Sequence, residues 1–303
     1  MNYAGELIRG GKKGLSRRQA EIARQRAFQF ALRLWKNWKS RAGMIILGAL
    51  VIMGVTAPLV APYSPYNISF NAWQAPSSAH LLGTDYEGAD VFSQFLIGTG
   101  TSLYVGVAVA IFAAAIGTLV GVITGYFGRI ADEVLMRFVD ILLVIPGFPL
   151  LVLLSAYFPP TLNTTIIILA ILSWPVLSRI IRAQVLTVKQ RPYVLASKLS
   201  GYGSFRIIYR DILPNLMPLI FINIIFLVVG AVVAQAGLAF FGLGDLRSVN
   251  WGTMLYWFDA EDGIVFRAWW WLLPPGIGIV LLGLGGNLLS NGLHEITQRR
   301  GGS

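Results

Sequence analysis

The chain has 303 residues, of which 55% are hydrophobic and only 13% are charged. This composition excludes an ordinary soluble domain and favours a membrane protein. The chain contains no cysteine, which excludes disulfides, thiolate metal sites and cysteine nucleophiles. The formal net charge is +10, but eleven of the 24 Lys and Arg residues lie within the first 41 positions. Because no nucleic-acid-binding motif accompanies this clustered charge, we expect no nucleic-acid partner.

Residues 1–41 form the first predicted unit, a basic segment on the cytoplasmic side of the membrane. Between Leu15 and Arg41, apolar residues recur at helical spacing at Phe28, Leu32 and Trp35, with Arg and Lys between them. This pattern predicts an interfacial amphipathic helix that contacts anionic membrane lipid. The alternative is a solvated basic tail that only sets the orientation of the chain in the membrane.

Long runs without charged residues predict the membrane spans, because a helical span needs about 20 mostly apolar residues. Six spans are expected: Gly43 to Val60, Leu103 to Ile123, two within Ile141 to Ser178 on either side of Tyr157-Phe158-Pro159-Pro160, one within Ile212 to Gly244, and Ala268 to Leu293. The sequence therefore predicts an all-α polytopic membrane protein. Residues 42–101 would hold the first transmembrane helix and an extracytoplasmic loop, and residues 102–303 a core of five transmembrane helices.

The distribution of charge predicts the orientation of these spans. With the N-terminus inside, the three outer loops contain only Arg247 and Arg267 among all the basic residues, and seven of the 14 acidic residues. Lys and Arg are retained on the cytoplasmic side of membrane proteins. We therefore expect a multi-pass protein of the cell membrane with both termini in the cytoplasm.

The inner loop at residues 190–213 predicts two short helices around a glycine turn. Pro192 suits the first turn of a helix, Gly201 a left-handed stop, Ser204 a new N-cap and Pro214 a break before the next span. A loop that is ordered, basic and apolar fits a docking element for another protein. From residue types alone, a pair of amphipathic helices lying against the membrane fits equally well.

This loop resembles the coupling-helix motif of the type I ABC importer permeases. The matching residues are Ala196, Gly201, Ile212, Leu213 and Pro214, whereas Leu195 stands where the family usually has Glu, Ser197 where it has Ala, and Asp211 where His is common. The resemblance implies that the loop docks on an ATP-binding subunit and transmits its closure to the spans. The docking residues would be Tyr193, Leu195, Ala196, Ser197, Lys198, Gly201, Tyr202, Ser204, Phe205 and Arg206.

A narrower resemblance, to the second (C-type) permease subunit of the dipeptide, oligopeptide and nickel importers, covers the chain from about Trp38 onward. Its motifs are Leu81 to Ser93, with Ala89 in place of a usual Arg; Gly125 to Gly128 with Asp132, Met136, Arg137, Asp140 and Pro146; Leu238 to Gly244; Trp251 to Leu255; and Asn287 to Leu293. It implies the type I ABC importer permease fold. The implied partners are a homologous second permease subunit, two ABC ATPase subunits and an extracytoplasmic solute-binding protein. The implied solutes are peptides, with oligosaccharide or nickel as alternatives.

The sequence predicts no cofactor of its own and no catalysis. It has no Gly-rich ATP-binding loop, so ATP and Mg²⁺ would be bound by the partner ATPases. It shows no nucleophile with a base in reach, no carboxylate pair and no His-Glu metal motif, and no metal site is expected. The competing class is a secondary transporter or channel that works alone, which should show an internal repeat or buried ionisable residues in mid-span. We find neither.

Several residues within the spans have individual interpretations. Gly117, Gly121 and Gly125 predict close helix packing. Arg137 and Asp140, three apart near the start of the third span, predict a local ion pair. Arg179 and Arg182 are expected to mark the inner membrane edge, and the candidates for lining the solute pathway are Trp174, Asn223 and Gln235.

Overall fold

The computed structural model describes residue 29 and residues 32–298. Within that part, the elements are α2 (Trp38–Val60), α3 (Val91–Phe127), α4 (Arg129–Val144), α5 (Gly147–Tyr157), α6 (Leu162–Val188), α7 (Pro192–Leu199), α8 (Ser204–Ile207), the π-helix η1 (Ile208–Ile212), α9 (Leu213–Phe240), α10 (Trp251–Ala260) and α11 (Trp269–Gln298). One isolated β-bridge joins Thr84 and Asp90. The all-α prediction is confirmed for these residues, whereas most of the expected N-terminal helix lies outside them.

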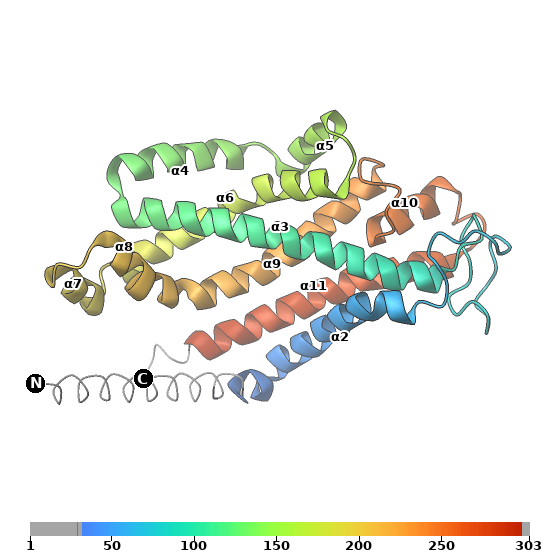
Figure 1. The fold of residues 1–303 in the computed structure, drawn as a ribbon, viewed down its shortest axis with the longest axis horizontal. Coiled ribbons are helices and arrows are strands. Elements are labelled where there is room, and N and C mark those ends of the chain that lie inside the picture. Colours follow the sequence, from blue (N-terminus) through green and yellow to red (C-terminus); the bar gives the residue numbers. More distant parts are fainter. Residues whose placement is uncertain (1–28, 30–31, 299–303) are drawn as a thin grey trace, which may run out of the picture.

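The helices run along the long axis of the molecule (Figure 1). The loop that carries α7 and α8 lies at one end, and α10 with residues 61–90 lies at the other, which we call the α10 end. The start of α2 and the end of α11 meet at the α7 end, where Asn37 Nδ2 donates to Glu295 Oε2 at 2.9 Å. Lys39 Nζ pairs with Glu295 Oε1 at 2.5 Å beside it.

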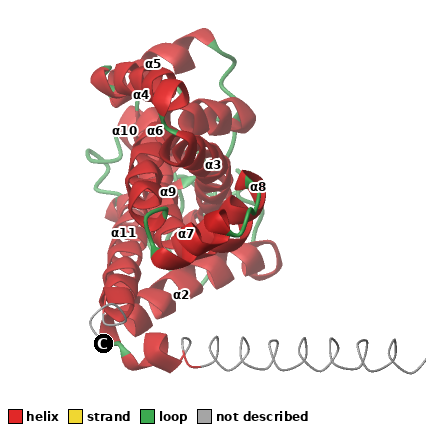
Figure 2. Ribbon diagram, turned by 90° about the vertical axis from the view of Figure 1, so that its left-hand side faces the viewer, coloured by secondary structure: helices red, strands yellow, loops and turns green. Residues whose placement is uncertain are grey.

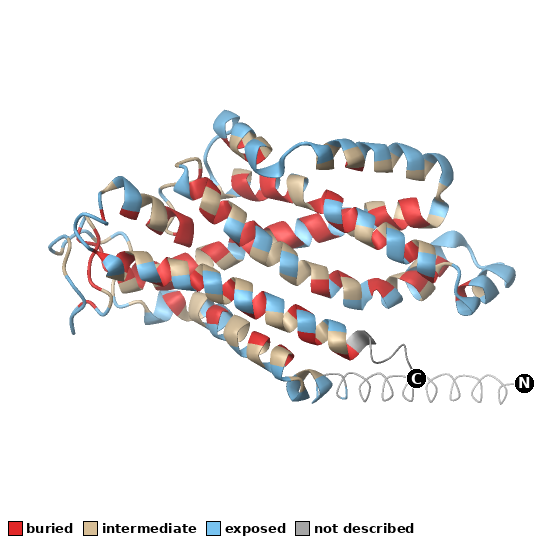
Figure 3. Ribbon diagram, turned by 180° about the vertical axis from the view of Figure 1, so that it is seen from behind, coloured by how far each residue is buried: buried red, intermediate tan, exposed pale blue. Residues whose placement is uncertain are grey.

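Viewed along the bundle, α3, α6 and α9 lie between α4–α5 on one side and α2–α11 on the other (Figure 2). Buried residues concentrate along α3 and α6, whereas α4, α5 and the α7–α8 region are largely exposed (Figure 3). Many exposed side chains on the long helices are large and apolar, for example Leu59 at 88% and Val280 at 66%. Such surfaces suit contact with lipid, because the hydrocarbon core offers no partners for polar groups.

Five helices are long and apolar enough to cross a membrane: α2, α3, α6, α11 and the continuous stretch Ser204–Phe240. The pair α4 and α5 gives a sixth span if it is counted as one, but it bends by 86°. The sequence places the third span between Ile141 and the turn at Tyr157, and the structure shows that this stretch is bent. Pro146 disfavours helical geometry at the residue before it, and Ile145 accordingly has extended backbone angles (φ −71°, ψ 128°).

Helix α3 begins at Val91, twelve residues before the start expected from hydropathy. Asp90 starts it, because its carboxylate accepts hydrogen bonds from Ser93 N at 2.8 Å and Ser93 Oγ at 2.7 Å, as an N-cap does. The second Asp90 oxygen contacts His80 Nδ1 at 2.9 Å, with both side chains buried. The loop after α2 therefore ends at residue 90, and the boundary expected at residues 101 and 102 falls inside a helix.

The tight packing of α3 on α6 confirms the glycine prediction. A Cβ added at Gly121 would lie 2.6 Å from the Ser178 carbonyl oxygen, and one at Gly125 would lie 2.7 Å from Val185 Cβ. Distances this short leave room only for glycine. Small residues let the two backbones approach, as is usual between membrane helices.

Two ion pairs tie α4 to α6. Arg182 donates to Asp132 from both Nε (2.5 Å) and Nη2 (2.6 Å). Arg179 pairs with Asp140. The prediction that Asp140 pairs locally with Arg137 is therefore wrong. Asp140 pairs with Arg179 of α6 instead, because α4 lies alongside α6.

Candidate functional site

The α7–α8 loop, residues 190–213, begins with the helix that the sequence predicts. Pro192 occupies the first turn of α7, where its missing N–H has no consequence. The helix ends at Leu199, and Gly201, two residues further on, has a φ of +77°. Gly201 N donates to the Lys198 carbonyl at 3.1 Å and Tyr202 N donates to the Ser197 carbonyl at 3.2 Å. These paired bonds form a Schellman motif, which needs a left-handed residue at this position.

The second half of the loop differs from the prediction at its start. Gly203, with extended backbone angles (φ −64°, ψ 151°), is the N-cap of α8, and Ser204 is the first residue of the helix. No side chain caps this terminus. The expected N-cap at Ser204 is therefore wrong by one residue, because the chain already turns helical there.

The sequence predicts a break at Pro214 before the next span, but the structure shows no break there. Helix α8 continues through η1 into α9, and Pro214 lies in the first turn of α9. Leu213 N donates to the Ile208 carbonyl, five residues back. Asn215 Nδ2 donates to the Asp211 carbonyl at 2.6 Å. The widened π-type turn accommodates the proline, as such bulges commonly do at irregular points in helices.

The inward face of the loop is anchored in the bundle. Val194, Ile207 and Ile212 are 3%, 1% and 0% exposed, respectively. They belong to one apolar cluster with residues of α6 and α9, including Ile181, Val185 and Leu216. At the base of the loop, Lys189 Nζ donates to the Gly125 carbonyl at 2.7 Å, in the last turn of α3. The loop is thus fixed to three long helices.

The outward face of the loop is apolar and uncovered. Leu199 is 89% exposed, Phe205 82% and Tyr209 69%. Full burial of one such side chain is worth about 1.5 to 3 kcal/mol relative to exposure. A well-ordered surface that leaves this much burial unused fits a protein partner.

The predicted docking residues lie on this same surface. Tyr193, Leu195, Ala196, Lys198, Gly201, Tyr202, Ser204, Phe205 and Arg206 are exposed, and Ser197 is half-buried. The Arg206 guanidinium lies 4.0 Å from the centre of the Tyr202 ring, a cation–π contact that holds both side chains. Leu199 and Tyr209 were missed. Leu199 follows Leu195 by four residues, a spacing that places both on one helix face.

The structure does not bring the three candidate pathway residues together. Trp174 is 8% exposed and stacks on Phe138 of α4. Asn223 lines a groove of about 300 Å³ between α6 and α9, and its Nδ2 donates to the Leu219 carbonyl at 2.8 Å. Gln235 is 4% exposed, and its Oε1 has no hydrogen-bond partner among the described residues. Of the three, Asn223 alone faces a groove.

No group of three or more His, Cys, Asp or Glu side chains that could hold a metal ion occurs in the part of the chain that the structure describes.

Two protein-family models match this chain. A family model described as the binding-protein-dependent transport system inner membrane component matches residues 117–301. A second model, described as the N-terminal TM domain of oligopeptide transport permease C, matches residues 25–77.

Three relatives are similar over nearly the whole chain. A protein of Brucella suis biovar 1 (strain 1330) that bears the name of a peptide permease is 36% identical over 267 residues, 88% of each chain. The dipeptide transport system permease protein DppC of Bacillus subtilis (strain 168) is 37% identical over 268 residues, 87% of this chain and 82% of the relative. A protein of Brucella abortus biovar 1 (strain 9-941), named for a peptide transport system permease, is 34% identical over 272 residues, 89% of this chain and 90% of the relative. This chain is a multi-pass membrane protein that belongs to the inner membrane components of binding-protein-dependent transport systems, the permease subunits of ABC importers, and within them to the C-type permeases.

Proposed function

We propose that this chain forms half of a membrane pathway that imports di- and oligopeptides. A homologous permease subunit would supply the other half, and an extracytoplasmic binding protein would deliver the solute. The peptide assignment is supported by the names of the relatives, one of which is a dipeptide transport system permease. The role as a driven subunit is supported by one structural observation, the ordered α7–α8 loop with its uncovered face of Leu199, Phe205 and Tyr209.

In this proposal two ABC ATPase subunits drive transport, and one of them docks on the α7–α8 loop. ATP and Mg²⁺ are bound by those subunits, and this chain catalyses nothing itself. The loop fits the role because its outward face is apolar while its inward face is fixed to α3, α6 and α9. A partner that moves the outward face therefore moves the long helices as well.

We propose an orientation with both termini in the cytoplasm, on the side of the α7–α8 loop. The start of α2 and the end of α11 lie at the same end as that loop (Figure 1). That end carries basic side chains such as Lys39, Lys198 and Arg206, whereas the α10 end carries acidic ones such as Asp85 and Glu87. This asymmetry is the one that the positive-inside rule associates with a cytoplasmic α7–α8 end. Residues 1–41 would lie at the inner membrane surface against anionic lipid.

The test is purification of the chain from its native membrane, followed by identification of what accompanies it. A second six-span permease and two ATPases with a Gly-rich ATP-binding loop are expected. If the chain is isolated alone and still conducts solute in liposomes, it is a secondary transporter or channel and the proposal is wrong.

The solute is tested by uptake. Deletion of the gene is expected to abolish uptake of labelled di- and tripeptides. Retained peptide uptake, with loss of oligosaccharide or nickel uptake instead, would assign the same machinery to one of those two solutes.

A further inference from the structure

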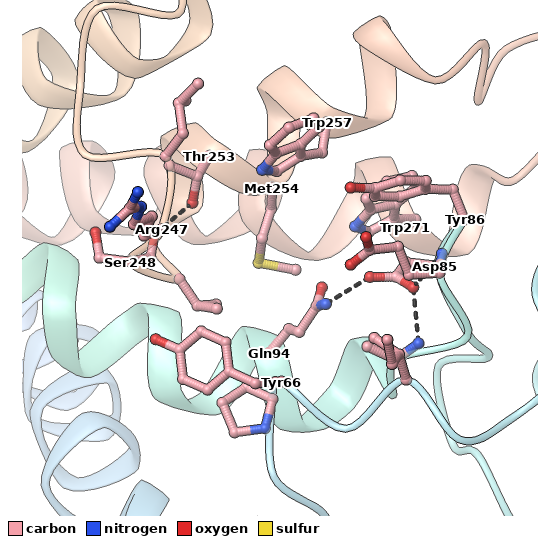
Figure 4. Close-up of a pocket in the computed structure, with 16 residues that line it drawn as sticks. Tyr66, Asp85, Tyr86, Gln94, Arg247, Ser248, Thr253, Met254, Trp257 and Trp271 are labelled. Carbon is pink, nitrogen blue, oxygen red and sulfur yellow. Dashed lines mark hydrogen bonds between the residues drawn. The ribbon is translucent and has the colours of Figure 1, made fainter.

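A cavity of about 380 Å³ lies at the α10 end of the molecule, where residues 65–94 meet α10 and the start of α11. Figure 4 shows Asp85, Tyr86 and Trp271 together on one side of the cavity and Arg247 and Ser248 on the opposite side, with Met254 and Gln94 between them. It lies far from the α7–α8 loop, at the end that the proposed orientation places outside the cell.

The floor of the cavity is a buried carboxylate without a cationic partner. Asp85 is 3% exposed. Its Oδ1 accepts from Glu87 N at 3.0 Å and from Ala89 N at 2.7 Å, and its Oδ2 accepts from Gln94 Nε2 at 2.6 Å. All three donors are neutral. None of the four ion pairs among the described residues includes Asp85 or the neighbouring Glu87.

The surroundings of this carboxylate disfavour its negative charge. Burial, with a further contribution from the charge of Glu87, raises the pKa of Asp85 above its usual value. Tyr86 lies between Trp257 and Trp271, with ring centres 5.7 Å apart in each case. Burial raises the pKa of its hydroxyl, and so do the negative charges of Glu87, Glu261 and Asp85. The cavity lining contains two carboxylates, Asp85 and Glu87, and one basic side chain, Arg247, which Figure 4 shows on the opposite side from Asp85. A cation beside Asp85 would therefore be stabilised by these two carboxylates.

A second feature of the cavity is a donor that has no acceptor. Trp271 is 1% exposed, and its Nε1 has no hydrogen-bond partner among the described residues. Its indole forms part of the cavity wall beside Asp85 (Figure 4). An unsatisfied buried N–H costs about 1 to 3 kcal/mol, so an acceptor on a bound molecule would relieve it.

The amino-terminal residue of a peptide carries both complementary groups. It has a protonated amine and, three bonds away, a carbonyl oxygen. We propose that this cavity binds the amino terminus of a peptide solute, with the ammonium facing Asp85 and Glu87 and the first carbonyl oxygen facing Trp271 Nε1. The proposal rests on the proposed import function, and it gives a chemical reason why a peptide rather than an oligosaccharide would be accepted.

The test is binding of trialanine and of N-acetyl-trialanine to the full chain in lipid nanodiscs, with its permease and ATPase partners but without the binding protein. Fluorescence of the tryptophans reports occupancy, since Trp257 and Trp271 line the cavity. Because acetylation removes the charge and one hydrogen-bonded group, we expect it to weaken binding by about tenfold or more.

Two variants and one control locate the binding. Glu87 is exposed, so Glu87→Gln removes a charge without removing the backbone bonds that Asp85 accepts. It is expected to weaken trialanine binding by about tenfold. Ala89→Arg places a guanidinium in the cavity and is expected to abolish binding. Asp259→Asn is an equal change of charge at an exposed residue of α10 outside the cavity lining, and it should leave binding unchanged.

Equal binding of both peptides, or unchanged binding by Glu87→Gln and Ala89→Arg, would overturn the proposal. Peptide uptake by the assembled wild-type transporter is measured separately. Uptake without discrimination at this cavity removes the site and leaves the import function standing. Discrimination at the cavity without any peptide uptake supports the site and removes the import function.

Discussion

The α7–α8 loop and the α10 end lie at opposite ends of the same long helices, and they differ in how far they bury their large aromatic residues. Both depend on left-handed glycines, Gly201 at one end and Gly83 and Gly88 at the other. At the α10 end Trp251 and Trp271 turn inward, at 0% and 1% exposed, although Phe266 and Trp269 are half exposed. In the α7–α8 loop Phe205 turns outward and is 82% exposed.

The two regions differ in whether large aromatic side chains find their contacts within the chain itself. At the α10 end, Trp251 donates from Nε1 to Thr99 Oγ1 and from its backbone N to Ser102 Oγ, each at 3.1 Å. The hydrogen bonds of Trp251 are therefore met within the chain, whereas Trp271 Nε1 has no partner among the described residues. The α7–α8 loop is equally well ordered by its Schellman motif, yet its apolar residues have no cover of their own. This combination of order and exposure is the reason for proposing that an ATPase subunit covers this face.

The strongest test of this comparison is Gly201→Glu. The φ of +77° disfavours any side chain, and the new carboxylate would enter an apolar docking face. We expect loss of solute-driven ATP hydrolysis and of transport, while the chain still inserts into the membrane. Membrane fractionation and ATPase assays of the reconstituted complex measure the two effects.

The matched control for this variant is Gly203→Ala. Gly203 has a φ of −64° and no atom within 4 Å of an added Cβ, so transport should persist. Normal transport by Gly201→Glu would remove the loop from the mechanism.

A sharper test separates the two faces of one short helix. Phe205→Ala removes an exposed ring, so it should weaken ATPase binding by about 2 kcal/mol or more and leave thermal unfolding unchanged. Ile207→Ala, two residues on and 1% exposed, should instead lower the stability of the chain by about 2 to 5 kcal/mol. Pull-down of the ATPase and fluorescence-monitored unfolding distinguish them. If both variants change the same quantity, the loop does not have separate docking and anchoring faces.

At the α10 end, Thr99→Val should lower stability without affecting the ATPase. The variant leaves Trp251 Nε1 buried without its acceptor, at a cost of about 1 to 3 kcal/mol in unfolding free energy. Tryptophan fluorescence during unfolding in detergent measures the change. Thr101→Val is the control, since the Thr101 hydroxyl bonds only to Ile97 O in its own helix at 3.3 Å. Weakened ATPase binding by Thr99→Val would show that the two ends are not independent.

The smallest effect is expected from Lys189→Met at the base of the α7–α8 loop. It removes the 2.7 Å bond to the Gly125 carbonyl and a favourable charge at the end of α3, together worth about 1 kcal/mol. Thermal unfolding should show the loss, whereas ATPase binding should be retained. A docking defect larger than that of Phe205→Ala would contradict the assignment of the outward face as the docking surface.

The sequence predicted the spans better than their shapes. Charge-free runs report which residues tolerate lipid, so they located α2, α6 and α11. They could not report that α4 and α5 bend at Pro146, because a bend leaves hydropathy unchanged. Placing the start of the second span at its first apolar residues also missed the first turns of α3, where polar residues such as Gln94 are buried beneath the loop rather than facing lipid.

In the candidate site, too, some features follow from local sequence and others only from the folded chain. The turn at Gly201 follows from local sequence, since few residues other than glycine adopt its backbone angles. The continuity past Pro214 depends on a π-type bond from Leu213 to Ile208, which residue types do not specify. The cavity at the α10 end assembles Asp85, Trp257 and Trp271, which are far apart in the sequence, so only the folded chain brings them together.

The unbroken stretch Ser204–Phe240 gives the molecule a mechanical property. Its 37 residues amount to a rod of roughly 55 Å, at 1.5 Å per residue. One end carries Phe205, and the other presses on α10, where a Cβ on Gly252 would come within 2.6 Å of Ala236 Cα. Helical turns continue through this stretch, so a tilt of the whole rod by about one degree displaces the far end by roughly 1 Å. The π-type turn η1 and Pro218 inside α9 are the points where such a rod bends most easily.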